Sequence, residues 1–301
     1  MKGAALDHFG TCPPTESAAA YDLHGPALPN GPLIVSVPHA GRDYPPELLA
    51  LARVRPEVLR RLEDRWADLL AQPLIARGYN VLVARAPRAM IDLNRHEREL
   101  DPAMVTGLPR ELPLQSSAKL RGGLGLIPRR LPGAQEIWQR PLPWSEAQWR
   151  IETLHRPYHA RLAQMMTAAR ERHGHAILID LHSMPPLPPP AAGQAAPGLV
   201  LGDRFGRSAA TRLMTLAADV AAGHGVLTSQ NHPYAGDHLI ERHGRPERDF
   251  HALQLEIDRA LYLDVTLDRP GPGLARIQGV VAAIAEALAN ELPRSYAMAA
   301  E

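Results

Sequence analysis

The chain of 301 residues is poor in cysteine, in lysine and in net charge. Its one cysteine, Cys12, excludes a disulfide framework and any zinc site built from several thiolates. The 33 basic and 32 acidic residues leave a formal net charge of +1, so no overall field attracts nucleic acid or an anionic membrane surface. Lysine occurs only as Lys2 and Lys119, and the remaining basic groups are guanidinium forks, which suit carboxylates.

A long hydrophobic run is also missing. The most apolar stretch, Val280 to Ala289, is interrupted by Glu286 and is shorter than the roughly 20 residues that span a bilayer. The first residues show no basic segment followed by an apolar run, so we expect no signal peptide and a cytoplasmic protein. With 45% hydrophobic and 22% charged residues, the composition is that of a folded globular chain.

Strand and helix patterns alternate along the chain. Short β-branched, apolar runs predict strands, and apolar residues at helical spacing predict the segments between them as helices. This order favours one α/β domain over residues 1–301, with a mixed, mostly parallel central sheet flanked by helices. The strands are expected at 32–38, 80–84, 175–181, 199–202, 226–229 and 253–257, and the helices at 56–77 (where Pro73 allows a kink or break), 145–172, 208–222 and 273–292.

Three stretches show no clear period. We expect an irregular N-terminal segment at 1–28, a long loop insertion at 99–143 and a loop rich in Pro and Ala at 185–197. A loop as long as 99–143 is usually functional, which makes it a candidate lid.

Two of the expected strands end in histidine, at His39 and His182. Open α/β sheets place their ligands at the carboxyl ends of the strands, and neutral imidazole is a common zinc ligand. A hydrolytic zinc site needs a third protein ligand, which must be a carboxylate here. The nearby candidates are Asp43, Glu47, Asp64 and Asp68.

An acidic residue, Glu256, lies between Leu255 and Ile257 inside an expected strand. Burial would raise its pKa and suit it to work as a general base. The alternative is a structural acid paired with an arginine such as Arg259.

An amide and a guanidinium stand side by side at Asn94 and Arg95, just after the strand at 80–84. Together they form a good carboxylate receptor, because arginine binds two oxygens in parallel and asparagine adds an oriented donor. Further arginines that could add charge are Arg88, Arg121, Arg129 and Arg242.

A series of short motifs resembles the N-formylglutamate amidohydrolase family over residues 32–268, in order. The motifs are SVPHAGRDYPPEL, EDRWADLL, APRAMIDLNRHERELDP, GLIPR, HRPYHARL, LIDLHSMPP, LGDRFG, NHPYAGDHLIERHG and LQLEIDRALYLD. The resemblance implies a hydrolase-like α/β fold of the zinc carboxypeptidase and aspartoacylase type. It also implies one Zn²⁺ per chain and cleavage of N-formyl-L-glutamate to formate and L-glutamate, a step of histidine degradation.

The same resemblance implies roles for single residues. His39 and His182 match the two zinc histidines, Glu256 the catalytic glutamate, and Asn94 with Arg95 the pair that holds the substrate carboxylate. One departure concerns the third ligand, because the glutamate usually found three residues after the first histidine is Arg42 here. Asp64 is our first choice for that ligand, on the helix expected at 56–77, and Asp43 and Asp68 are the alternatives.

The remaining expectations concern the arginines and the competing functions. Arg88 is expected to stabilise the oxyanion, and Arg129 or Arg242 to bind a second carboxylate of a small-molecule substrate. The competing functions are a related zinc amidohydrolase or carboxypeptidase acting on another N-acyl amino acid, and a metal-free dicarboxylate-binding protein. The sequence leaves the oligomeric state open.

Overall fold

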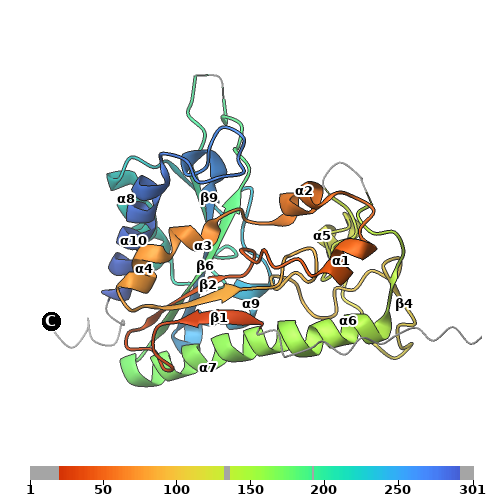
Figure 1. Cartoon of the computed structure of the whole chain (residues 1–301). Coiled ribbons are helices and arrows are strands. Elements are labelled where there is room, and N and C mark those ends of the chain that lie inside the picture. Colours follow the sequence, from red (N-terminus) through yellow and green to blue (C-terminus); the bar gives the residue numbers. More distant parts are fainter. Residues whose placement is uncertain (1–19, 132–135, 192, 292–301) are drawn as a thin grey trace, which may run out of the picture.

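A seven-stranded sheet organises the chain in the computed structural model, which describes residues 20–131, 136–191 and 193–291 (Figure 1). The strand order is β1-β3-β2-β6-β9-β7-β8. The strands are β1 (Tyr21–His24), β2 (Leu33–Val37), β3 (Asn80–Ala84), β6 (Ala176–Met184), β7 (Leu199–Gly202), β8 (Thr228–Gln230) and β9 (Phe250–Asp258).

The four central strands β3, β2, β6 and β9 run parallel to one another. Antiparallel pairing occurs toward the edges, between β1 and β3 and between β7 and β9, and β8 runs parallel to β7. The prediction of a mixed, mostly parallel sheet is therefore confirmed. The parallel strands end at the same edge of the sheet, so residues that follow β2 and β6 come together there.

Helices cover both faces of the sheet, because the side chains of each strand alternate between two apolar layers. In β6, Ala176 and Leu178 belong to one layer, and Ile177, Ile179 and Leu181 belong to the other. Figure 1 shows α6 and α7 running along the first face and the helices of the second face gathered at the left. The first face is covered by α6 (Trp144–Arg150), a π-helical turn (Ile151–His155), α7 (Arg156–His173) and α9 (His238–His243), and the second by α3 (Ala67–Leu70), α4 (Gln72–Ala76), α8 (Thr211–Gly223) and α10 (Leu274–Ala289).

The remaining elements are short. They are α1 (Pro46–Leu51), α2 (Pro56–Leu59), α5 (Ala118–Arg121), the paired strands β4 (Val105–Thr106) and β5 (Leu142–Pro143), and 3-10 turns at Arg60–Leu62, Pro246–Arg248 and Arg259–Leu261. The long stretch at 99–143 thus contains only β4, α5 and β5 as regular elements in its described part; residues 132–135 lie outside the described residues. No helix or strand occurs at 185–197 in the described residues, which leave out 192.

The helix predicted at 56–77 is wrong in its first part, because its main break lies well before Pro73. The segment forms α2, a 3-10 turn, α3 and α4, and the chain leaves the helical path between Leu62 and Ala67. Two tertiary contacts hold this break: the Asp64 N–H donates to the His39 carbonyl at 3.0 Å, and Trp66 Nε1 donates to the Asp268 carbonyl at 2.7 Å. Trp66 has a left-handed backbone (φ 59°), which no helix interior allows. Tertiary bonds therefore override the apolar periodicity.

We expected an irregular segment over residues 1–28, but part of it forms a strand. Tyr21–His24 form the edge strand β1, paired with β3, and the sequence signal was too short to show it. Residues 1–19, which include Cys12, and residues 292–301 lie outside the described residues. None of the helices in the described ranges combines the length and apolar character that crossing a membrane requires.

A glycine allows the ends of β2 and β3 to approach each other. A Cβ on Gly41 would overlap the backbone carbonyl of Ala86, so Gly41→Ala has to push the two segments apart. Because overpacking of this kind typically costs about 1–3 kcal/mol, we expect this variant to lose stability in urea unfolding. Gly279→Ala is the control, since Gly279 lies in α10 with open space around it. It should gain about 0.5–1 kcal/mol, and equal stability of the two variants would contradict the close approach.

Candidate active site

Two buried imidazoles meet at the carboxyl ends of the central strands. His39 follows β2. His182 lies near the end of β6, the strand next to β2 in the sheet. Their ring centroids are 4.7 Å apart, and the rings are tilted by 60°. The β6 strand is otherwise a buried apolar strand, so Asp180 and His182 need polar partners to be stable inside it.

The carboxylate of Asp64 lies between the two rings. Its Oδ2 is 2.8 Å from Nδ1 of His182 and 3.4 Å from Nδ1 of His39. One ligand atom from each of the three residues lies within 4.8 Å of the other two, so this group could hold a metal ion. The break between α2 and α3 creates this arrangement, because it bonds the Asp64 backbone to the His39 carbonyl.

The far nitrogens of both rings contact a second pair of carboxylates. Nε2 of His39 is 2.8 Å from Asp92 Oδ1, and Nε2 of His182 is 2.9 Å from Asp180 Oδ2. Each Nε2–H donates to its acid, so a metal ion at Nδ1 of either ring would take the place of a proton there, such as the one shared by His182 Nδ1 and Asp64 at 2.8 Å. Metal-binding histidines usually donate their other N–H to a carboxylate or a carbonyl in this way.

The charges of the group suit a cation. Burial alone would raise the pKa of Asp64 and of Asp92, but the imidazoles, and in the case of Asp92 also Arg88, outweigh burial and lower both pKa values. Burial would lower the pKa of His182, but Asp180 and Asp64 raise it well above its usual range. Nδ1 of His39 is buried and has no hydrogen-bond partner among the described residues. Three acids and an unpartnered imidazole nitrogen fit a divalent ion with nitrogen and oxygen ligands.

The other three carboxylate candidates lie outside the group, and Glu47 is exposed in the first turn of α1. Asp68 forms a two-fold ion pair with Arg42, at 2.7 and 2.8 Å, and Asp43 is exposed beside Arg85. Arg42 stands where the family's glutamate is usually found, and it also stacks on Trp66. Arg259 donates to Asp64 Oδ1 at 3.2 Å and to Ser183 Oγ at 3.1 Å, so it fixes the Asp64 carboxylate.

Glu256 is the register partner of His182 on the neighbouring strand β9, so the two side chains share a face of the sheet. Gln254 Nε2 donates to its Oε1 at 3.0 Å, and no ion pair to Glu256 occurs in the described part of the chain. Burial, with a smaller contribution from Asp64, raises the pKa of Glu256 to about 7 against the opposing effect of His182. A pKa near 7 would suit the general base that the sequence predicts, and Arg259 is bonded to Asp64 instead.

Arg88 lies at the edge of this group. Its Nε donates to Asp92 Oδ2 at 2.8 Å, while neither Nη group donates to another described residue. The side chain is 18% exposed, so a small molecule can reach it. Arg88 thus combines an anchored position near His39 with free donors.

Asn94 and Arg95 are buried and bonded to the protein. Asn94 Nδ2 lies 3.2 Å from His182 Nε2 and 3.4 Å from Asp180 Oδ2, and its Oδ1 accepts from the Leu239 N–H at 2.7 Å. Arg95 donates to the carbonyls of Leu124 and Asn94 and pairs with Asp237 at 3.0 Å. In this structure, therefore, Asn94 contacts Asp180 and His182, and Arg95 is bonded to the surrounding protein. The contact of the two side chains with a substrate stays a prediction.

Arg129 and Arg242 are not joined to the group by any contact. Arg129 donates to Asp101 and Glu136 and ties the long loop together. Arg242 is exposed on α9 and has no ion pair within the described ranges. Their proposed role in binding a second carboxylate stays untested.

Comparisons with known proteins agree with this geometry. Residues 31–263 match the family model described as N-formylglutamate amidohydrolase. The N-formylglutamate deformylase of Pseudomonas putida is 30% identical over 251 residues, which cover 78% of this chain and 83% of that protein. The chain belongs to the N-formylglutamate amidohydrolase family.

Solved structures support the family assignment. The crystal structure of N-formylglutamate amidohydrolase from Ralstonia eutropha JMP134 is similar with a TM-score of 0.82 and 33% identity, and the match covers 94% of this chain and 100% of that chain. A gene product from Agrobacterium tumefaciens, at 17% identity and a TM-score of 0.58, shares the fold; the match covers 94% of this chain and 95% of that one. The family fold therefore extends over most of the chain.

Sequence reasoning did not assign three residues of this family member's site. Asp92 and Asp180 hold the far nitrogens of the two histidines, and Arg259 holds Asp64. A signal existed for Asp180, because it precedes His182 by two positions in a strand and so shares its face. For Asp92 and Arg259 the pairing depends on loops that the sequence does not specify.

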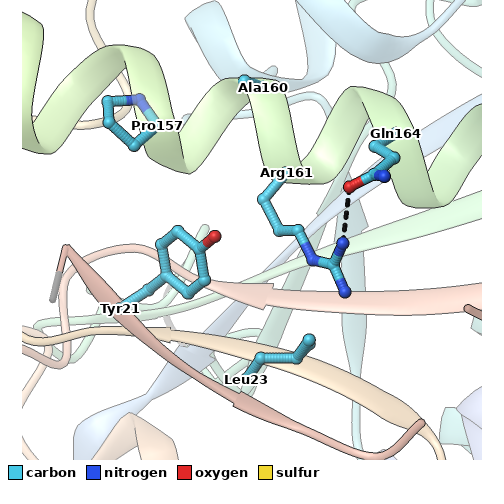
Figure 2. A pocket seen from close by; sticks show the side chains of 6 residues that line it. All are labelled: Tyr21, Leu23, Pro157, Ala160, Arg161 and Gln164. Carbon is cyan, nitrogen blue, oxygen red and sulfur yellow. Dashed lines mark hydrogen bonds between the residues drawn. The ribbon is translucent and has the colours of Figure 1, made fainter. Parts of the chain in front are cut away.

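Two hollows formed by described residues lie outside the group. One, of about 630 Å³, lies between β1 and α7, where Figure 2 shows Tyr21 and Leu23 opposite Arg161 and Gln164. The other, of about 350 Å³, is lined by Arg42, Trp66 and their neighbours on the far side of the Asp64 segment. Neither is lined by His39, Asp64, His182 or Glu256, so the candidate site rests on its side chains and not on cavity size.

Removing the carboxylate between the rings should remove the metal. We expect Asp64→Asn to reduce bound zinc strongly, because an amide replaces the charged ligand, whereas Asp68→Asn should retain it because Asp68 faces Arg42. Elemental analysis of the two purified variants measures this directly. Full zinc in Asp64→Asn together with loss in Asp68→Asn would transfer the ligand role to Asp68.

Proposed function

We propose that the protein hydrolyses the amide bond of N-formyl-L-glutamate, giving formate and L-glutamate. The observation that carries the proposal is the His39–Asp64–His182 group together with Glu256, whose side chain shares a face of the sheet with His182. The names of the relatives support the substrate, since the similar Pseudomonas putida protein is an N-formylglutamate deformylase. The proposal includes one Zn²⁺ per chain, a place in histidine degradation, a cytoplasmic location and a small-molecule substrate rather than a nucleic acid.

The metal would be held by Nδ1 of His39, Nδ1 of His182 and the Asp64 carboxylate. When bound, Zn²⁺ polarises a carbonyl and lowers the pKa of water from about 16 to about 7. Asp92 and Asp180 accept the Nε2–H of the two rings, which would direct Nδ1 of each ring to the metal. Arg259 restrains the Asp64 carboxylate at its other oxygen.

Glu256 moves the proton. Its pKa of about 7 lets it accept a proton from water as the oxygen attacks the formyl carbon. The same carboxyl then delivers that proton to the nitrogen of the leaving glutamate, so that the C–N bond breaks to a neutral amine. Gln254 keeps one Glu256 oxygen oriented through the 3.0 Å bond.

Arg88 is the positive group best placed to act on the substrate. Its Nε is anchored on Asp92, and its free Nη groups can donate to the developing oxyanion. Asn94 with Arg95, and Arg129 or Arg242, remain the predicted partners of the substrate carboxylates. Since a formyl group is small, selectivity should come from the dicarboxylate end.

A substrate panel tests the proposed reaction. We expect the protein to release the amine from N-formyl-L-glutamate with a higher kcat/KM than from N-acetyl- or N-succinyl-glutamate or the aspartate analogues. Preference for another acyl group would favour the related amidohydrolase. Purified protein that contains no zinc, and that binds these compounds without turnover, would favour the metal-free dicarboxylate-binding protein.

Glu256→Gln separates chemistry from metal binding. Since the amide cannot accept the proton, we expect kcat to fall by about a hundredfold or more, with unchanged zinc content. Stopped assays of formate release and elemental analysis of the same sample give both values. Wild-type turnover in this variant would remove Glu256 from the mechanism.

A further inference from the structure

One continuous helix bonds three backbone carbonyls of the segment that carries Asp92 and Asn94. The helix consists of α6, the π-helical turn and α7. From it, Arg150 Nη1 donates to the Met90 carbonyl at 2.8 Å, His155 Nε2 to the Arg95 carbonyl at 2.8 Å, and His159 Nε2 to the Leu93 carbonyl at 2.9 Å. All three side chains are at most 1% exposed.

The segment held in this way links the helix to the candidate metal group. Asp92 contacts the far nitrogen of His39, and Asn94 lies against the far nitrogen of His182. The two histidine-bonded carbonyls, of Leu93 and Arg95, are those on either side of Asn94. A shift of this backbone would therefore move the groups that orient both imidazoles.

A second helix completes the support. On α9, the Leu239 N–H donates to Asn94 Oδ1, and His243 Nε2 lies 3.0 Å from His159 Nδ1, with the two rings stacked at 12°. The Nε2–H of His159 donates to the Leu93 carbonyl, so its Nδ1 carries a lone pair. That lone pair accepts a hydrogen bond from the Nε2–H of His243. Asn94 and the His159 ring, which holds the Leu93 carbonyl, are thus both bonded to α9.

These histidines are neutral donors. Burial, with the neighbouring imidazoles and Arg242, lowers the pKa of His159 well below its usual range, and burial lowers the pKa of His155 to about 4 despite its bond to the Arg95 carbonyl. Each ring therefore carries one N–H near neutral pH. That single proton is the one committed to the backbone carbonyl.

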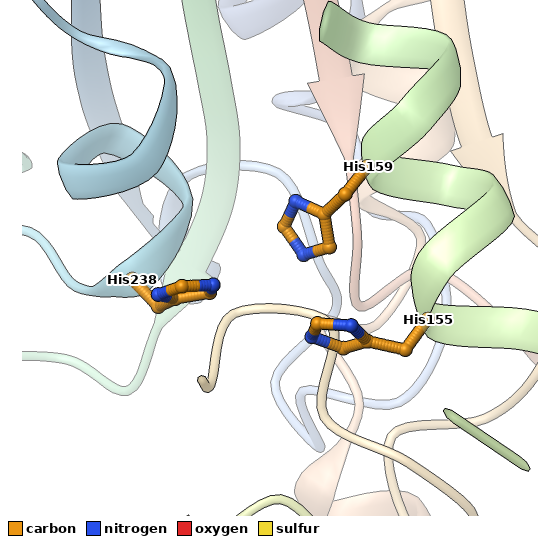
Figure 3. Close-up of side chains that lie close together, drawn as sticks. All are labelled: His155, His159 and His238. Atoms are coloured by element: carbon orange, nitrogen blue, oxygen red, sulfur yellow. The ribbon is translucent and has the colours of Figure 1, made fainter. Parts of the chain in front are cut away.

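The rings of His155, His159 and His238 lack the three free ligand nitrogens of a second metal site, because, of their buried nitrogens, only His155 Nδ1 and His238 Nε2 are without a partner among the described residues. Figure 3 shows His155 and His159 on one helix with His238 facing them, and one nitrogen of each lies within 4.8 Å of the others. However, Nε2 of both helix histidines donates to a carbonyl, and Nδ1 of His159 accepts from His243. His159 has no lone pair left for a cation.

We infer that His155 and His159 are positioning residues, which hold the Asp92–Arg95 backbone so that Asp92 and Asn94 orient the two metal-binding imidazoles. This inference rests on the proposed function of the His39–Asp64–His182 group. Partners of metal ligands typically change metal affinity by 10- to 100-fold when mutated, and His155 and His159 act one step further out. We therefore expect effects of about tenfold.

The experiment compares variants that keep or lose the donor at the Nε2 position. A glutamine amide extends to about the position of imidazole Nε2, whereas an asparagine amide reaches only the Nδ1 position. We expect His159→Asn and His155→Asn to bind zinc about tenfold more weakly than wild type in competition with a chelator, and to lower kcat with little change in KM. His159→Gln and His155→Gln should restore most of both values.

His251→Leu is the matched control. His251 is also a buried histidine with a lowered pKa. It lies near the start of β9, whereas Glu256 lies near the other end of that strand. It should lower the melting temperature without changing zinc affinity. The inference is overturned if the Asn variants of His155 and His159 behave like this control, or if Gln and Asn have equal effects.

Wild-type protein separates this inference from the proposed function. If wild type binds no zinc, or binds zinc and does not release formate from N-formyl-L-glutamate, the proposed function fails. If wild type does both and the Asn variants retain wild-type zinc affinity, only the positioning role fails.

Discussion

The pairing of each site imidazole with its own buried carboxylate is the interaction on which the rest of the site depends. Asp92 holds Nε2 of His39 and Asp180 holds Nε2 of His182, so both Nδ1 atoms turn toward Asp64. Without these acids either ring could rotate or change tautomer, and the ligand set would be lost. Buried charges of this kind are costly unless they are paired, so the site needs a cation or protons to be stable.

The sheet explains why such costly groups can be gathered in one place. β2, β6 and β9 are parallel neighbours, and their polar residues come at one edge, where His182 and Glu256 share a face and His39 follows the end of β2. The apolar layers on both sides of the same strands provide the burial that keeps these groups in place. The helix that covers this face then supplies the donors that hold the Asp92–Arg95 segment.

Much of this organisation could be predicted from the sequence, because it depends on local patterns. The strands that carry His39 and His182 are short apolar runs, and alternation alone puts Glu256 on the face opposite Leu255. The break around Asp64 could not be predicted, since the residues from Pro56 to Arg77 have helical spacing and the break is held by bonds to His39 and Asp268, distant in sequence. The sequence pattern puts Asp64 on a helix, whereas in the structure Asp64 reaches the rings because the chain is not helical there. The burial of Arg95 was also not visible, because its acidic partner Asp237 lies far along the chain.

The central claim is that one divalent cation lies between Nδ1 of His39, Nδ1 of His182 and the carboxylate of Asp64. An anomalous-difference map from a crystal of the zinc-loaded protein, measured on both sides of the zinc absorption edge, tests it most directly. The account predicts a single strong peak in contact with these three residues. A peak held by other residues, such as the rings of His155 and His238, or no peak at the strand ends, would contradict it.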